Sequence, residues 1–272
     1  MSPLKSAPDV TNLTLSKGQV LIKRRDPVTL LGTGYRHAGN VDKFSTKPTV
    51  EVIDVMNSMD DTGGIYAEIV KTTKVELSIE GFEYDPNNVA LSLYGDVTPY
   101  AQAAVPTVTD QAFTTDAEVV LDGYYEIGAR NATITAIKQG ATTLTAGTDY
   151  VIVDANVGMI HLLPTSTAAV AGTKLTWSGS IPVIDAALGN KLITIATAPQ
   201  MPATVRFLPK PKHGPNLDVT LWSVNLTPNG EPEFISDTVA KIALKGTVQM
   251  DAVGQFGGSA ANPYGQVIVW RN

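Results

Sequence analysis

The sequence predicts a mainly β protein with one long hairpin, one short helix and a small β-sandwich inserted into the chain. Three observations lead to this fold class. Apolar and polar residues alternate from Ile65 to Glu80, one helix start occurs at Asp85-Pro86, and short apolar runs separated by turn residues fill residues 105–182.

The alternation beginning at Ile65 is the strongest signal. Its odd positions are mostly apolar and its even positions mostly polar, which is typical of a strand with one packed face and one solvated face. We expect the odd positions from Ile65 to Ile79 to pack inward. We expect Glu68, Glu76 and Glu80 to share the polar face, diluted only by Lys74, which leaves that face acidic.

The preceding run, residues 47–56, is also strand-like, and the turn-rich residues 57–64 (NSMDDTGG) predict the tip of a hairpin. The apolar phase of this first strand slips between Val52 and Ile53, which predicts a bulge. A hairpin this long exceeds what one small core can cover, so we expect neighbouring copies to support its far end.

A short helix is expected directly after the hairpin. Asp85 is a good N-cap, Pro86 suits the first helical position, and Gly95 ends the helix. Residues 99–109 (PYAQAAVPTVT) then read as a linker into a second unit. The predicted domains are a core formed by residues 1–104 and 183–272, and an inserted sandwich-like domain at 105–182.

Further strands are expected in both predicted domains. In the insertion they are Glu118–Leu121, Thr133–Ile137, Tyr150–Val153, Met159–Leu163 and Lys174–Trp177, and after it Lys191–Ala196, Thr204–Leu208, Val219–Leu226 and Val239–Met250. The apolar terminal run Val267–Trp270 must also pair, in this chain or on a neighbour.

Composition excludes several function classes. The net charge of −6 argues against a nucleic-acid-binding surface, and the absence of cysteine excludes disulfides and thiolate chemistry. No apolar stretch approaches the roughly 20 residues of a membrane span, and the N-terminus lacks a secretion signal. We therefore expect neither membrane insertion nor secretion.

No residue pattern points to catalysis, a cofactor or a metal. Walker, GxSxG and HExxH motifs are missing, so the chain is predicted not to be an enzyme. The acids Asp60-Asp61 are interpreted as solvated turn residues and Arg24-Arg25-Asp26 as a surface ion pair. His161 is expected to be half-buried and hydrogen-bonded, and the tryptophans to pack in a core or an interface.

The order of these elements resembles a known family. A short N-terminal strand, the GNVDKFS stretch (39–45), the VEVIDVMNS…IYAEIVKTTKVELSIEG hairpin and the DPNNVALSLYGD helix together look like the tail tube protein (major tail protein) of long-tailed, non-contractile bacteriophages. The resemblance covers residues 15–98 well and 190–250 loosely, and it leaves 105–182 uncovered.

The resemblance implies a tail-tube-type β-sandwich or barrel with one flanking helix. Six copies would form a ring, and stacked rings would form a hollow tube through which DNA passes. By position, the hairpin at 46–80 would line the ring, with Glu68, Glu76 and Glu80 facing the channel. The tip residues Asn57, Asp60, Asp61, Gly63 and Gly64 would reach an adjacent subunit or ring.

The resemblance also implies binding partners and a location for the protein. The partners would be further copies of the chain, a tape-measure protein and tail-terminator or baseplate proteins, while DNA would pass through the lumen without specific binding. The protein would be assembled in the host cytoplasm and reside in the virion tail, and residues 105–182 would decorate its outer surface.

Two other functions remain open at this point. One is a β-rich adhesin or glycan-binding module, in which residues 105–182 would bind the ligand. The other is a capsid-decorating virion protein, which would bind a shell lattice without polymerising.

Overall fold

The computed structural model of the chain describes residues 12–59 and 63–270. The protein is mainly β, as predicted, and the described residues contain one α-helix. The chain divides into two compact units, residues 1–97 with 193–272 and residues 98–192. The predicted insertion, residues 105–182, lies within the second of these.

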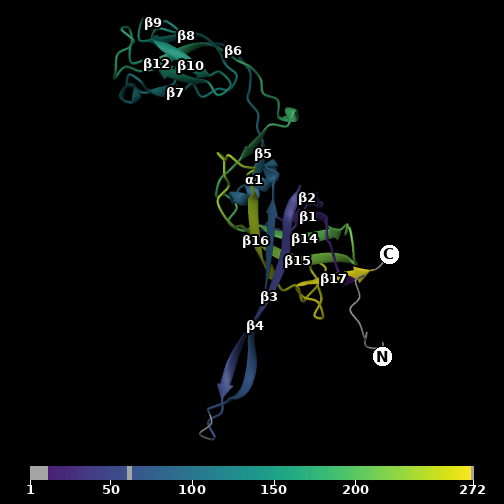
Figure 1. The fold of residues 1–272 in the computed structure, drawn as a ribbon. Helices are drawn as coiled ribbons and strands as arrows, with labels where there is room; N and C mark the ends of the chain where they lie inside the picture. The colour runs from purple at the N-terminus through teal and green to yellow at the C-terminus, as the bar shows by residue number, and fades with distance from the viewer. Residues whose placement is uncertain (1–11, 60–62, 271–272) are drawn as a thin grey trace. The chain divides into compact units, whose positions relative to one another are not determined.

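The first unit is built on one antiparallel sheet of eight described strands (Figure 1). Their order is β2-β1-β14-β15-β16-β4-β3, and β17 pairs with the part of β15 that β16 leaves free. The strands are β1 (Gly18–Arg24), β2 (Arg36–His37), β3 (Val41–Met56), β4 (Ile65–Gly81), β14 (Pro202–Pro209), β15 (Asn216–Pro228), β16 (Ile242–Gln249) and β17 (Gly265–Trp270).

The sheet curls, so that strands from its two ends approach each other. The ring of Phe44 on β3 stacks on that of Phe207 on β14, with 5.4 Å between centroids and 13° between planes. The apolar side chains inside the curl form the core of the unit, which includes Val20, Ile22, Leu77, Ile79, Val205, Leu226 and Leu244.

Helix α1 (Pro86–Ser92) forms where the capping signal predicted it. The Asp85 carboxylate accepts a hydrogen bond from the Asn87 amide at 2.9 Å, and Pro86 occupies the first turn. Val89 and Leu91 are buried in the core of the unit. Gly95 follows because the chain passes so close to Thr194 that a Cβ would meet its carbonyl oxygen.

The second unit is a β-sandwich of two small sheets, of order β10-β11-β7 and β6-β12-β8-β9. The strands are β6 (Val105–Ala112), β7 (Tyr124–Glu126), β8 (Thr133–Gln139), β9 (Thr142–Leu144), β10 (Tyr150–Asp154), β11 (Met159–Leu162) and β12 (Leu175–Ile181). Trp177 lies in the core between the sheets, as expected. The strands β5 (Val97–Pro99) and β13 (Lys191–Ile193) pair with each other.

Two local predictions in this unit are wrong. Part of the expected linker is strand β6, which tolerates Pro106 because it lies at the edge of its sheet. The expected strand Glu118–Leu121 does not form. Its first residue instead ends a 3₁₀ turn, in which the Glu118 carboxylate accepts the Thr115 amide at 2.6 Å.

The expected surface pair at Arg24-Arg25-Asp26 is also corrected. Arg24 does form an exposed ion pair, but with Asp96. Arg25 is buried, with its guanidinium 3.6 Å from the centroid of the Phe256 ring and hydrogen-bonded to Thr204, Ser223 and two backbone carbonyls. This side chain therefore belongs to the packing of the unit and forms no surface ion pair with a described residue.

Candidate functional site

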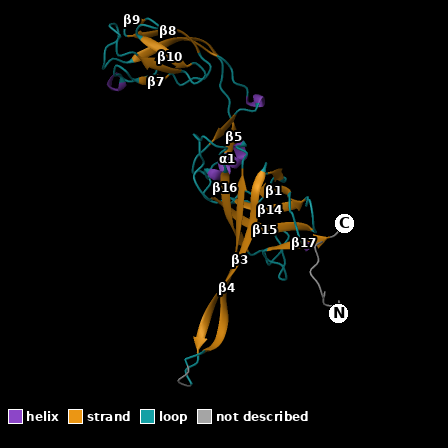
Figure 2. Cartoon of the chain, in the orientation of Figure 1, coloured by secondary structure: helices purple, strands orange, loops and turns teal. Residues whose placement is uncertain are grey.

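The long hairpin has a covered base and an uncovered end. Strand β16 pairs with β4 only from Val75 to Gly81. Beyond Val75, the strands β3 and β4 have only each other as partners among the described strands. We call residues 50–56 and 65–73 the arm. It projects past the rest of the sheet (Figure 2).

The side chains of the arm are apolar and exposed. Leu77 and Ile79, at the base, are 1% and 3% exposed, whereas Ile65 and Ile69 in the same strand are 56% and 55% exposed. The expectation that the odd positions pack inward is therefore wrong for the outer half of β4. The exposed apolar residues of the arm are Val50, Val52, Ile53, Val55, Met56, Ile65, Tyr66, Ile69 and Val70.

A bulge separates the base from the arm. Glu51 pairs with Thr72 but Val52 pairs with Val70, so Lys71 is an extra residue in β4. The Glu51 carboxylate accepts hydrogen bonds from both Lys71 Nζ and Thr72 Oγ1, each at 3.0 Å, which places both side chains on one face. The predicted bulge thus lies one residue earlier in β3 than expected, and its extra residue is in the other strand.

The bulge separates the three predicted glutamates. Directly paired residues share a face, and alternation along β3 puts Lys47 and Asp54 on opposite faces. Glu76 pairs with Lys47, whereas Glu68 pairs with Asp54. We call the face of Leu77 and Ile79 the inner face and that of Glu76 and Glu80 the outer face. Glu68 lies on the inner face, so the prediction that the three share a face is wrong.

The outer face is not acidic either. Asp42 on β3 pairs with Lys241, which also interacts with Glu80. The other charged residues of this face on β3 and β4 are the four lysines Lys43, Lys47, Lys71 and Lys74 and the three glutamates Glu51, Glu76 and Glu80. Lys43 and Glu80 form an ion pair at 2.7 Å. The hydrogen bond from Lys71, and to a smaller extent the one from Thr72, lowers the pKa of Glu51. The acidic face predicted from β4 alone is wrong because β3 places Lys43 and Lys47 beside the glutamates of β4.

The inner face of the arm carries an unfavourable pair. Asp54 and Glu68 lie directly opposite each other across the ladder, and within the described part of the chain neither carboxylate has an ion-pair partner. Like charges in directly opposed positions destabilise a hairpin. An adjacent cation on another molecule would relieve this repulsion.

The tip is only partly described. The Asn57 amide donates to the Gly64 carbonyl at 2.8 Å, and the Asn57 side chain accepts the Met59 amide at 2.9 Å. Gly63 has a positive φ of 63°, which glycine adopts without strain. Asp60 and Asp61 lie outside the described residues.

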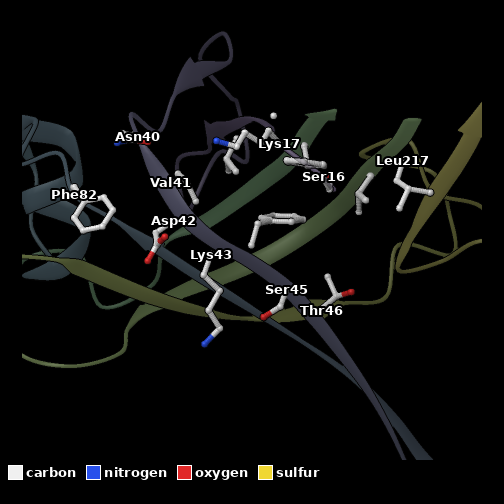
Figure 3. Close-up of a pocket in the computed structure, with 15 residues that line it drawn as sticks. Ser16, Lys17, Asn40, Val41, Asp42, Lys43, Ser45, Thr46, Phe82 and Leu217 are labelled. Atoms are coloured by element: carbon white, nitrogen blue, oxygen red, sulfur yellow. The ribbon is translucent and has the colours of Figure 1, made fainter. Parts of the chain in front are cut away.

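A groove opens where the ends of the curled sheet approach each other (Figure 3). Its volume is about 750 Å³. The groove is lined by Ser16, Lys17, Gly18, Val20, Asn40, Val41, Asp42, Lys43, Phe44, Ser45, Thr46, Phe82, Phe207, Leu217 and Val219. Gly18 lies under the Phe207 ring, where a Cβ would come within 2.6 Å of it.

The apolar floor of this groove continues onto strand β17. Phe207 pairs with Val219, and Val219 pairs in turn with Val267. Leu217 pairs with Val269 in the same way. Because paired residues share a face, Val267 and Val269 extend the floor, and they are 57% and 59% exposed. Sequence reasoning noted the apolar run in β17 but could not place it beside the groove.

The second unit carries one polar contact of interest. His161 is partly buried, stacks on Tyr124, and lies 2.8 Å from Asp122 through Nε2, which confirms the expected hydrogen-bonded histidine. Among residues 12–59 and 63–270, no group of three or more histidine, aspartate or glutamate side chains is arranged to hold a metal ion. In the same residues, no helix has the length and apolar character needed to cross a membrane.

A family model matches residues 13–267, which include the arm, the groove and both units. The chain belongs to this family. It is described as "Protein of unknown function UCP028589". No curated protein matches the chain. The match extends over residues of both units.

Proposed function

We propose that this protein is a non-enzymatic structural subunit that associates with copies of itself into stacked rings. In its specific form, the proposal is the one the sequence resemblance implies: the tail tube protein of a long-tailed, non-contractile phage, with six copies in each ring. The uncovered apolar arm is the observation that carries the proposal.

Self-association would remove exposed apolar surface and an unpaired strand edge from water. Soluble proteins rarely expose large contiguous apolar surfaces, and they protect long sheet edges with charges, prolines or covering segments. The arm exposes apolar side chains on both faces, and the outer edge of β3 has no partner among the described strands. The proline of β3, Pro48, lies before the arm, so it does not interrupt the edge of residues 50–56. Closing such edges against further copies removes them from solvent.

The same geometry favours a particular orientation in a ring. The inner face of the hairpin base packs on the unit's own core, so the outer face, with Glu76 and Glu80, is the one left to line a channel. Glu68 is excluded from that lining because it lies on the inner face of the arm. The mixed charge of the outer face would let DNA pass without a continuous cationic track.

Electron microscopy of the purified protein tests the proposal. We expect rings or tubes in negative stain after expression of this chain alone. A variant with Val52, Ile53, Ile69 and Val70 changed to threonine keeps β-branched side chains but loses apolar surface, so it should remain dispersed.

A matched control has the same number of changes in the second unit, with Val151, Val153, Val170 and Val183 changed to threonine. These residues are also exposed. The control should still assemble. Discrete single-copy particles from the unmodified protein would contradict the proposal and favour an adhesin or a capsid-decorating protein.

A further inference from the structure

We propose that the groove beside β17 receives the arm of a second copy of this chain, with the inner face of the arm against the groove floor. This inference rests on the proposed self-association and goes further by naming the two surfaces that meet. It has four supports: reach, apolar surface, charge and exposure of the strand edge.

The arm of a chain is too far from the groove of the same chain to occupy it. Phe44 forms part of the groove wall, and Val52 lies eight residues farther along the same strand. At about 3.3 Å per residue, that separates them by about 26 Å of extended backbone. The arm could return to its own groove only by breaking β3, so the occupant is another molecule.

Apolar surface is present on both sides of the proposed contact. The inner face of the arm offers Val50, Val52 and Val70, which continue the row of buried side chains at the hairpin base beyond the end of the core. The groove offers Phe207 and Val219, extended by the exposed Val267 and Val269. Joining these surfaces would bury apolar area that each copy alone leaves in water.

Charge fixes which face of the arm enters. The inner face carries the opposed carboxylates of Asp54 and Glu68, which lack a cation. Two lysines and one aspartate line the groove. Asp42 is paired with Lys241 and Lys43 with Glu80, whereas Lys17 forms no ion pair with a described acidic residue. Lys17 would therefore neutralise one of the two carboxylates and relieve their repulsion when the arm is seated. The outer face of the arm offers no such match, because Lys71 already satisfies Glu51.

Strand β17 supplies an open edge to the same contact. Its only described strand partner is β15, and Val267, Ile268, Val269 and Trp270 are all exposed. The described part of β17 has no proline or charged residue to prevent pairing. Because the two surfaces lie at different places on one chain, the contact is head-to-tail and propagates from copy to copy.

Reversal of charge tests the contact. Lys17→Glu alone, and Asp54→Lys with Glu68→Lys, should each turn attraction into repulsion and raise the dissociation constant of self-association about tenfold. The three changes together restore opposite charges and should return the constant close to that of the unmodified protein. Sedimentation velocity gives the constants, and circular dichroism checks that each variant is folded.

Engineered cysteines give a second readout that does not depend on these charges. The chain contains no cysteine, so a disulfide can form only between introduced residues. Copies with Val70→Cys, mixed with copies carrying Val269→Cys, should cross-link under mild oxidation. Val28→Cys is the control partner, because Val28 is well exposed and lies outside the groove.

The outcomes separate the inference from the proposed function. Assembly without charge rescue and without a cross-link between positions 70 and 269 would overturn the inference and leave self-association standing. A protein that stays monomeric at all concentrations would overturn both. Rescue together with the cross-link would support both.

Discussion

The base and the arm of the long hairpin belong to the same two strands, but apolar side chains are buried at the base and exposed in the arm. At the base, strand β16 pairs with the edge of β4 and the core covers the inner face, so Leu77 and Ile79 are buried. In the arm, Ile65 and Ile69 are large aliphatic residues like Leu77 and Ile79 and also occupy odd positions of β4, yet more than half of each side chain is exposed. Alternation therefore identifies a strand, whereas burial depends on what the rest of the chain places against it.

The largest expected difference is in stability. Leu77→Ala removes a fully buried side chain and should lower the free energy of unfolding by about 2–5 kcal/mol. Ile69→Ala changes an exposed side chain and should alter the free energy of unfolding by no more than about 0.5 kcal/mol. Urea unfolding at a concentration low enough to keep the protein monomeric measures both. Equal losses would mean that the arm is packed in the isolated subunit.

A smaller effect tests the assignment of the two faces. Glu68→Lys would replace a like-charge pair with an attractive pair between Asp54 and the introduced lysine, which should stabilise the hairpin by about 0.2–1 kcal/mol. Glu76→Lys would oppose Lys47 with a second cation and should destabilise it by about as much.

Thermal unfolding of the two variants should thus shift in opposite directions. Glu68→Gln and Glu76→Gln serve as controls that remove charge without reversing it. If both lysine variants shift the same way, the bulge at Lys71 does not separate the glutamates.

The smallest effect is at the bulge itself. The hydrogen bond from Lys71, followed by that from Thr72, lowers the pKa of Glu51 below its usual value of 4.5. A lowered carboxyl pKa stabilises the folded hairpin at pH values above the unfolded-state pKa of Glu51. This contribution is lost as the pH falls through the lower, folded-state pKa. The protection factors of amide exchange in the arm, measured by NMR and corrected for the intrinsic pH dependence of exchange, should fall over that acidic range.

Glu51→Gln is the control for this titration. It should remove the pH dependence of the protection factors near the bulge while leaving protection at the hairpin base unchanged. If the pH dependence of protection were the same in Glu51→Gln, the hydrogen bonds of Glu51 would not stabilise the arm.

Much of the fold could be predicted because its signals are local. Alternation identified the long hairpin, and Asp85 with Pro86 identified α1. The extra residue Lys71 could not be read from the sequence, because a bulge is a property of two paired strands and the register of β3 against β4 is set by the whole sheet.

The candidate site was predicted in part. The arm was expected to need support, but the groove could not be foreseen, because it brings together residues before β1, on β3 and on β15 through the curl of the sheet. The error at the three glutamates has the same origin. Their side chains were assigned from one strand, while the neighbouring strand determines both their face and their charge.

The most direct test of the central claim is sedimentation velocity of the purified chain over a wide range of concentration. We predict growth into rings or larger assemblies, and we predict that threonine at Val52, Ile53, Ile69 and Val70 abolishes growth while the subunit keeps its fold. A single monomeric species at every concentration, or full assembly by the threonine variant, would contradict it.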